Sequence, residues 1–102
     1  MRLIVMFDLP TVEKEDKKNY QKFRNFLLND GYDMLQWSIY SRLVNGFDQM
    51  ETHKSRLVAN LPPTGSIRLL EVTENQYTKM SVLVGTKKVS ELRNDGDQLS
   101  FF

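Results

Sequence analysis

The amino-acid sequence predicts an α+β domain in which two helices pack on one face of an antiparallel sheet. Three observations carry this prediction. Residues 3–7 form an unbroken apolar run, two later stretches space their apolar residues as helices do, and two strand-like segments follow the pair Pro62-Pro63. The order is therefore strand, helix, extended stretch, helix, strand, strand, as in a split βαβ sandwich.

The composition is that of one small domain, residues 1–102, because 40% hydrophobic residues in a chain of 102 supply a single core, expected at about residues 1–85. Cysteine is absent, which excludes a disulfide framework, a thiolate nucleophile and a cysteine zinc site, and fits a cytoplasmic location. The apolar N-terminus reaches Asp8 too early for a signal peptide or a membrane span. We therefore expect no membrane partner.

The first strand is expected over residues 3–7, buried on both faces and ended by Asp8 and Pro10. Thr11 is placed to cap the helix that follows, which should run from about Glu13 to Asp30. An apolar stripe at spacings of three and four defines this helix: Tyr20, Phe23, Phe26 and Leu27. Gly31 is a suitable left-handed stop.

Residues 32–44 suit extended structure, with the strongest strand propensity through Trp37-Ser38-Ile39-Tyr40. No Gly, Pro or Asn interrupts the stretch until Asn45, so the sequence shows no turn chemistry for a hairpin. Whether the stretch is one strand or two stays open at this point.

A second helix is expected between Asn45-Gly46 and Pro62-Pro63. Its apolar stripe is predicted from five residues: Phe47, Met50, Leu57, Val58 and Leu61. Two strands then follow, Ile67–Thr73 and Met80–Val84, separated by a polar stretch. The chain ends in Phe101-Phe102, which is too apolar to remain in water, so we expect another surface to cover it.

Asp8 is the candidate catalytic and metal-binding residue. It follows the apolar strand directly, so its hard carboxylate oxygens should stand on a rigid support at the edge of the core. Such a ligand suits Mg²⁺, and in a two-fold dimer both Asp8 carboxylates could share one ion. The alternative is that Asp8 only caps a turn or pairs with a lysine.

Basic residues are the candidate nucleic-acid contacts. The net charge of +1, from 14 basic and 13 acidic side chains, favours no partner, so the distribution of charge has to decide. Four lysines gather on the first helix: Lys14, Lys17, Lys18 and Lys22. They suit phosphate contacts, although acidic neighbours make a merely solvated face the alternative.

Other polar and aromatic residues are expected to be structural. Asp30 and the other helix-terminal carboxylates favour helix ends, and His53 is expected at the surface without a role, since no second ligand stands at metal-binding spacing. Trp37 and Tyr40 could stack bases, but aromatic residues on strands of a small core more often pack beneath a helix. We predict both in the core.

Taken in order, Leu3 to Pro10, Gly31-Tyr32 and Gln36 to Tyr40 resemble the small endonuclease subunit of CRISPR adaptation. That family shows an apolar strand ending in aromatic-Asp-hydrophobic-Pro, a helix ending near Gly-aromatic, and a Gln-x-Ser-hydrophobic-aromatic strand. The resemblance covers essentially the whole chain. The form from Phe7 to Thr11 is similar to members that accompany single-effector (type II) systems.

The resemblance implies a ferredoxin-like βαββαβ protomer and a homodimer in which an extra C-terminal strand, within about residues 80–102, is exchanged onto the partner's sheet. It implies Mg²⁺ held by the paired Asp8 residues. It also implies that the dimer binds double-stranded DNA, with RNA as an alternative substrate, and bridges subunits of the CRISPR integrase.

Three functions are therefore weighed. The first is an adaptation protein that holds the integrase and the DNA duplex, with metal-dependent endonuclease activity at Asp8 as a secondary property. The second is a toxin-like ribonuclease of the same fold that acts on single-stranded RNA. The third, a regulatory domain for a small ligand, ranks last because no Gly-rich phosphate loop is present.

Overall fold

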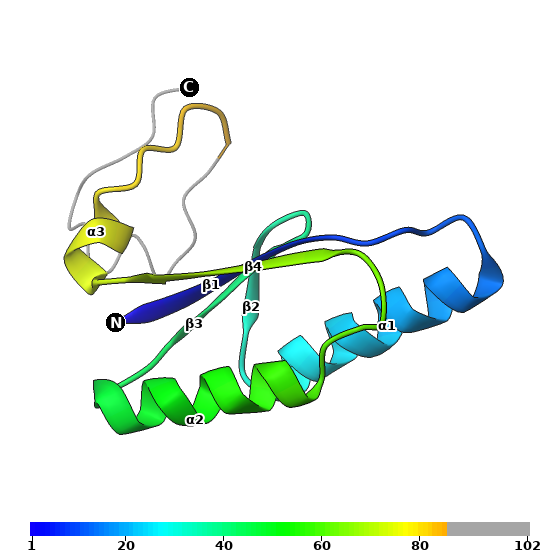
Figure 1. Ribbon diagram of the computed structural model, residues 1–102. Coiled ribbons are helices and arrows are strands. Elements are labelled where there is room, and N and C mark those ends of the chain that lie inside the picture. The colour runs from blue at the N-terminus through cyan, green and yellow to red at the C-terminus, as the bar shows by residue number, and fades with distance from the viewer. Residues whose placement is uncertain (86–102) are drawn as a thin grey trace.

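The computed structural model describes residues 1–85. One antiparallel sheet has the order β2-β3-β1-β4, built from β1 (Arg2–Asp8), β2 (Asp33–Gln36), β3 (Ile39–Leu43) and β4 (Ser66–Val72). Helices α1 (Lys14–Asn29) and α2 (Gly46–Ala59) lie along one face of the sheet, and the short α3 (Glu74–Thr78) follows β4 (Figure 1). The predicted α+β class and βαββαβ order are confirmed.

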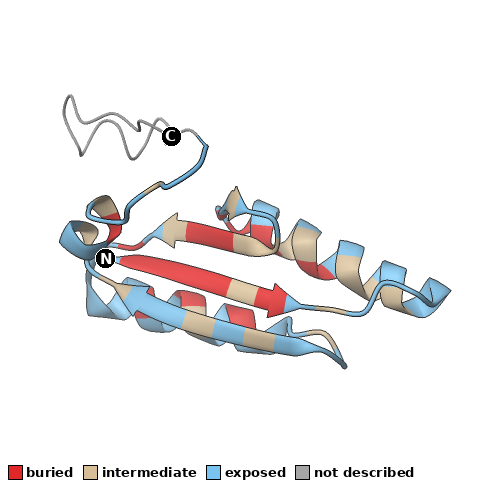
Figure 2. Ribbon diagram, turned by 90° about the horizontal axis from the view of Figure 1, so that it is seen from above, coloured by how far each residue is buried: buried red, intermediate tan, exposed pale blue. Residues whose placement is uncertain are grey.

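Strand β1 is the centre of the sheet and its side chains alternate between two different environments. It pairs with β3 on one side and β4 on the other, so that Val5 lies opposite Tyr40 and Leu69. The odd-numbered residues face the helices, where Leu3 and Val5 have no exposed surface. Ile4, Met6 and Asp8 face the opposite side, called here the open face. Figure 2 shows β1 as the most buried strand.

Phe7 joins the sheet to α1 through three aromatic contacts. Its ring centroid lies 5.3 Å from that of Phe23 and 6.0 Å from that of Tyr20, both edge to face, and 5.7 Å from that of Tyr40, stacked. Tyr40 is 1% exposed, so its predicted place in the core is confirmed. Because Phe7 points inward, its neighbour Asp8 has to point outward.

Helix α1 agrees with the predicted range of Glu13 to Asp30, since those two residues are its N-cap and C-cap. The predicted cap at Thr11 is wrong. Glu13 takes the position instead, and its backbone N–H donates to the carboxylate of Asp16 at 3.3 Å. Gly31 follows the helix with φ of 91°, as expected of a left-handed stop.

The extended stretch of residues 32–44 forms two strands, which decides the question that the sequence left open. Strands β2 and β3 are joined at Trp37-Ser38, and Ser38 is the residue that adopts the left-handed backbone, with φ of 64°. A serine gives no strong turn signal, which is why the hairpin was not visible in the sequence. The N–H of Phe7 donates to the carbonyl of Ser38 at 3.1 Å and ties the turn to β1.

Helix α2 buries a narrower stripe than predicted. Met50, His53 and Leu57 are its buried residues. The prediction is wrong for three others, which are exposed: Phe47, Val58 and Leu61. Val58 follows Leu57 directly and is therefore rotated about 100° away from the stripe. Its exposure follows from helix geometry.

The segment after β4 differs from the prediction in two ways. The polar stretch contains α3, capped by Thr73, whose hydroxyl accepts from the N–H of Gln76 at 3.0 Å. Its Tyr77 is buried beneath the guanidinium of Arg2, 4.4 Å from the ring centroid. The predicted strand Met80–Val84 is wrong for the described chain, because this segment joins no strand of the sheet.

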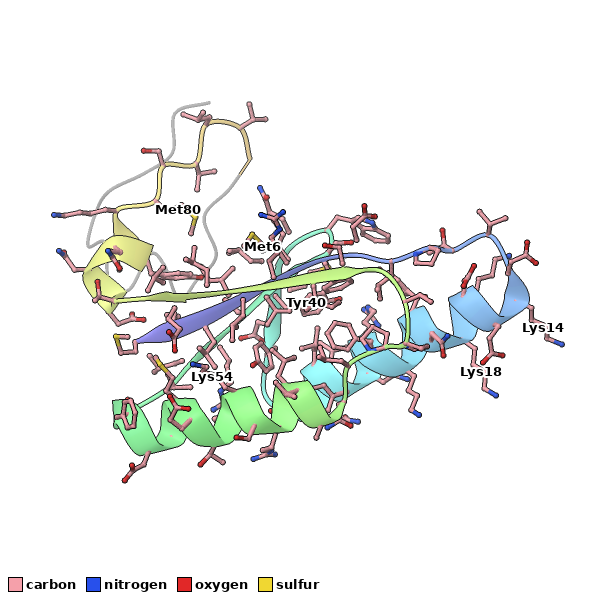
Figure 3. All side chains as sticks on the ribbon, viewed as in Figure 1. Met6, Lys14, Lys18, Tyr40, Lys54 and Met80 are labelled. Atoms are coloured by element: carbon pink, nitrogen blue, oxygen red, sulfur yellow. The ribbon has the colours of Figure 1, made fainter. Side chains whose placement is uncertain are left out.

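Instead, residues 80–85 run over the open face, where they line a hollow of about 730 Å³ together with Ile4, Met6 and Leu70. Figure 3 shows Met6 and Met80 on this side of the sheet and Tyr40 on the side of the helices. Phe101-Phe102 and the remainder of the expected exchanged strand lie outside the described residues. No helix formed within residues 1–85 has the length and apolar character that a membrane crossing requires.

Candidate functional site

Asp8 is the last residue of β1 and its side chain is exposed on the open face. It pairs across the sheet with Ser66, the first residue of β4. The strand beneath it belongs to the most buried part of the fold, so a solvent-exposed carboxylate stands on a rigid base. This is the position that the sequence predicts for a metal-binding aspartate.

Gly65 fixes the course of the backbone just after Asp8. Its φ is 95°, and a Cβ atom added there would lie 2.8 Å from the carbonyl oxygen of Asp8 and 2.4 Å from a methyl carbon of Leu9. Any side chain at position 65 would therefore displace the end of β1. The close approach holds the carboxylate of Asp8 in place relative to β4.

Asp8 shares a shallow, open hollow with residues from three strands and one turn. The hollow is lined by Met6, Phe7, Asp8, Trp37, Ser38, Ile39, Ser66 and Arg68. Asp8 pairs with Ser66, and Met6 pairs with Arg68. The carboxylate of Asp8 and the guanidinium of Arg68 therefore lie on the same face, with Arg68 two residues further along β4 than the partner of Asp8. A carboxylate, a guanidinium and two hydroxyls suit a cation and a phosphate group.

The donor atoms fit Mg²⁺ in kind, but one subunit supplies few of them. Mg²⁺ takes hard oxygen ligands and commonly binds through one or two carboxylates, together with water and substrate phosphates. Within residues 1–85, no three side chains among His, Cys, Asp and Glu gather as a metal cluster. Asp8 is the one carboxylate that lines the hollow. Within residues 1–85, no second carboxylate stands beside it.

The four candidate lysines do not lie with Asp8. Lys14, Lys17, Lys18 and Lys22 are all exposed on α1, and Figure 3 shows Lys14 and Lys18 pointing away from the sheet. Since α1 covers the helix face and Asp8 stands on the open face, the two sets face opposite sides of the molecule. Lys18 and Lys22 share a shallow depression with polar side chains of the same helix: Gln21, Asn25 and Asn29.

Trp37 is where the structure departs most from the predicted core. The prediction of a buried ring is wrong, because 78% of the residue is exposed at the turn between β2 and β3. The turn carries the ring beyond the sheet, so no helix covers it. The strand register brings three further residues to the candidate site: Trp37, Arg68 and Ser66. This register cannot be read from the sequence.

Asp30 is the centre of a second, buried polar cluster. Its carboxylate contacts Nδ1 of His53 at 3.2 Å and the guanidinium of Arg56, and its backbone carbonyl accepts from Arg42. The prediction of a surface His53 is wrong, because only 7% of it is exposed. The cluster ties the end of α1 to α2 and β3, and it lies apart from Asp8.

Tyr32 borders this cluster and carries a perturbed hydroxyl. The residue is 2% exposed, and its hydroxyl has no hydrogen-bond partner among residues 1–85. Burial raises the pKa of Tyr32 to about 12, and the negative charge of Asp30 adds to the effect, against the opposing charges of Arg42 and Arg56. The side chain is therefore neutral in the native protein at ordinary pH.

The open face next to Asp8 carries apolar side chains in contact with water. Leu70 is 48% exposed, and the overlying residues Leu83 and Val84 are 67% and 85% exposed. All three border the hollow between the sheet and residues 80–85. An apolar surface of this kind suits contact with another apolar surface.

Comparison with known proteins identifies relatives along the whole chain. The family described as CRISPR associated protein Cas2 matches residues 1–80. A CRISPR-associated endoribonuclease Cas2 of Acidovorax ebreus is 50% identical over 102 residues, which is 100% of both chains. A protein of the same name from Lacticaseibacillus rhamnosus is 40% identical over 98 residues, 96% of each chain.

A solved structure supports the same fold. The crystal structure of Streptococcus pyogenes Cas2 at pH 6.5 superposes with a TM-score of 0.63 and 21% sequence identity, and it covers 82% of this chain and 100% of its own. At this identity the match concerns the fold, and it agrees with the βαββαβ order of the sheet and helices.

We predict that Tyr32 makes stability depend on alkaline pH. Its pKa is about 12 in the native state and the ordinary value of 10.0 in the unfolded state, so its contribution is complete below pH 10 and is lost as pH rises toward 12. Urea unfolding of the wild type and of Tyr32→Phe at pH 9 and pH 11 measures this loss. The wild type should lose more stability than the variant between the two pH values, and equal losses would contradict the assignment.

Proposed function

The chain belongs to the CRISPR-associated Cas2 family, and from that membership we propose that it works as a homodimer in the acquisition of new CRISPR spacers. The dimer holds a DNA duplex for the CRISPR integrase and supports Mg²⁺-dependent cleavage of phosphodiester bonds at Asp8. One observation carries the proposal: Asp8 stands exposed on the same face as the water-exposed apolar surface around Leu70 and residues 80–85. We extend it to the single-effector subtype on the form Phe7-Asp8-Leu9-Pro10-Thr11 alone, and a gene for a single effector nuclease beside this one would support that extension.

The apolar surface of the open face suits a second copy of this chain. In a two-fold dimer the same patch meets itself, so Leu70 and the residues of the 80–85 segment would be covered in both subunits at once. Exchange of the C-terminal segment, residues 80–102, would also pair the exposed edge of a sheet. Asp8 lies on this face, so an axis near its end of β1 brings two carboxylates together.

The residues around Asp8 divide the work of binding a phosphodiester. Paired Asp8 carboxylates would hold Mg²⁺, and the ion when bound polarises the phosphate and lowers the pKa of a water molecule. Arg68 is placed to donate to phosphate oxygens from the same face, and Ser66 lies directly opposite Asp8 in the strand register. These residues bind and orient the group to be cut.

The site offers few groups that could support catalytic turnover, so we rank binding of the DNA duplex above its cleavage. The side chains that line the hollow include neither a histidine nor a second carboxylate that could serve as a general base. His53, the one histidine of the chain, is buried and paired with Asp30. A rigid dimer with exposed lysines meets the demands of duplex binding more readily than those of rapid catalysis.

The lysines of α1 suit a DNA duplex. Lys18 and Lys22 lie one turn apart on a face that also carries Gln21, Asn25, Asn29 and the half-buried Phe26. Lys14 and Lys17 extend the charge toward the start of the helix. Each lysine that meets a phosphate releases a counterion and strengthens binding at low salt. A two-fold dimer doubles the number of such contacts.

A second candidate, a ribonuclease that acts on single-stranded RNA, is favoured by the names of the relatives, which call them endoribonucleases. Such an enzyme needs the Asp8 site but no integrase. Copurification with a CRISPR integrase from the same organism separates the two functions. Stable capture supports the adaptation role, and RNA cleavage without capture supports the ribonuclease.

The dimer predicts a strong effect of Leu70→Asp. A charge on the open face would have to be buried without a partner, so the variant should be monomeric at concentrations where the wild type is dimeric. Light scattering after size-exclusion chromatography measures this. Val58→Asp is the matched control, since Val58 is 68% exposed on α2. Dissociation of both variants, or of neither, contradicts the proposed interface.

Asp8→Ala is expected to lower Mg²⁺-dependent cleavage about a hundredfold or more, because a bound metal ion contributes several kcal/mol to such reactions. Duplex DNA and single-stranded RNA are the two substrates to compare. Asp33→Ala removes an exposed carboxylate from β2 and is the control. If Asp8→Ala abolished spacer acquisition while the dimer and its complex stayed intact, the ranking of holding above cutting would be wrong.

Replacement of the four α1 lysines by alanine is expected to weaken duplex binding. The slope of log K against log salt concentration should fall by about one for each phosphate contact removed. Titration of a labelled duplex at several salt concentrations measures it. The double variant Lys54→Ala/Lys79→Ala removes exposed or half-exposed charges elsewhere and should change the slope little. An equal change per charge would show that general charge, not α1, binds the duplex.

A further inference from the structure

We propose that Trp37 stacks on an unpaired nucleobase beside the phosphodiester bound at Asp8, so that this end of the sheet selects single-stranded nucleic acid. The inference rests on the proposed role of Asp8 and names the class of substrate that its site takes. It starts from the exposure of the ring, since 78% of the one tryptophan of the chain is in contact with water.

The ring of Trp37 is held on a rigid support. The turn that carries it is closed by pairing of Gln36 with Ile39, and the carbonyl of Ser38 accepts from the N–H of Phe7 in the central strand. Ser38 keeps a left-handed backbone, a conformation that costs a serine free energy and that clusters at functional sites. An aromatic plane is thus displayed from a turn that is tied to the central strand.

The groups beside Trp37 complement the rest of a nucleotide. Asp8 and Arg68 line the same hollow and suit a metal ion and a phosphate oxygen. Every base has a π-face, so an aromatic ring binds bases of any sequence. A phosphate at Arg68 with the adjacent base on Trp37 uses both features of one nucleotide unit.

Stacking on Trp37 excludes a base inside a duplex. A paired base is already covered above and below by its neighbours, so its face is free only after the strand has opened. The α1 lysines, in contrast, meet phosphates on the other side of the molecule and require no unpaired base. The two faces therefore bind different forms of nucleic acid.

The test measures binding in EDTA, so that it does not depend on cleavage at Asp8. Trp37→Ala is titrated with a labelled short single-stranded RNA, the same sequence as DNA, and the corresponding duplex. We expect its affinity for single strands to fall on the order of tenfold or more, with duplex affinity unchanged. Trp37→Phe should restore most of the affinity. Phe47→Ala, which removes a 74% exposed ring from α2, is the matched control.

The single tryptophan gives a second readout in the wild type, because stacking should quench its fluorescence in proportion to bound single strand. Comparison of the RNA and DNA arms shows which strand is preferred. The proposal is overturned if Trp37→Ala binds single strands normally, or if it weakens the duplex equally. A shift of emission on dilution without oligonucleotide would also overturn it, by showing that a second subunit covers the ring.

An unchanged single-strand affinity in Trp37→Ala, together with loss of cleavage in Asp8→Ala, would remove the stacking role and leave the nuclease. Weakened single-strand binding without any cleavage by the wild type would leave the stacking role and remove the nuclease. The two experiments therefore fail independently of each other.

Discussion

The packing of Phe7 is the constraint on which the rest of the structure depends. Its ring contacts Tyr20 and Phe23 of α1 and Tyr40 of β3, so one side chain fixes the helix to the sheet and the hairpin to the central strand. In a strand, successive side chains point to opposite faces. The inward position of Phe7 therefore dictates that Asp8 points outward. A residue of the core and an exposed candidate residue are adjacent in sequence for that reason.

This alternation divides the molecule into two surfaces of different character. The helix face is fully packed, and its outer side presents lysines and amides along α1. The open face keeps apolar residues such as Leu70 in contact with water, and Asp8 and Trp37 stand at its end. A domain of this size gains little by leaving such a face in contact with water. The distribution of residues favours an assembly in which the open face is shared and the helix face stays free.

Much of the fold was predictable, because the apolar run of β1 and the stripe of α1 report directly on burial. The exposed position of Asp8 was predictable as well, since it follows a buried strand. Arg68 and Ser66 were not, because they join Asp8 only through strand register. Trp37 and His53 were placed wrongly for a common physical reason: the general preferences of a residue type were used where local geometry decides. The turn between β2 and β3 exposes Trp37, and Asp30 provides a buried partner for His53.

The site in one subunit has more groups that suit a nucleotide than groups that suit a metal ion, and this difference decides its chemistry. A single carboxylate binds a divalent ion weakly, whereas a guanidinium and an aromatic ring bind a nucleotide without any metal. Two-fold symmetry would strengthen metal binding alone, because it would bring two carboxylates to one point. Each tryptophan ring would still bind its own nucleic-acid strand. In the proposed dimer, cleavage would therefore depend on association more steeply than binding of a single strand does. Any condition that opens the dimer should separate the two activities, with binding of a single strand lasting longer than its cleavage.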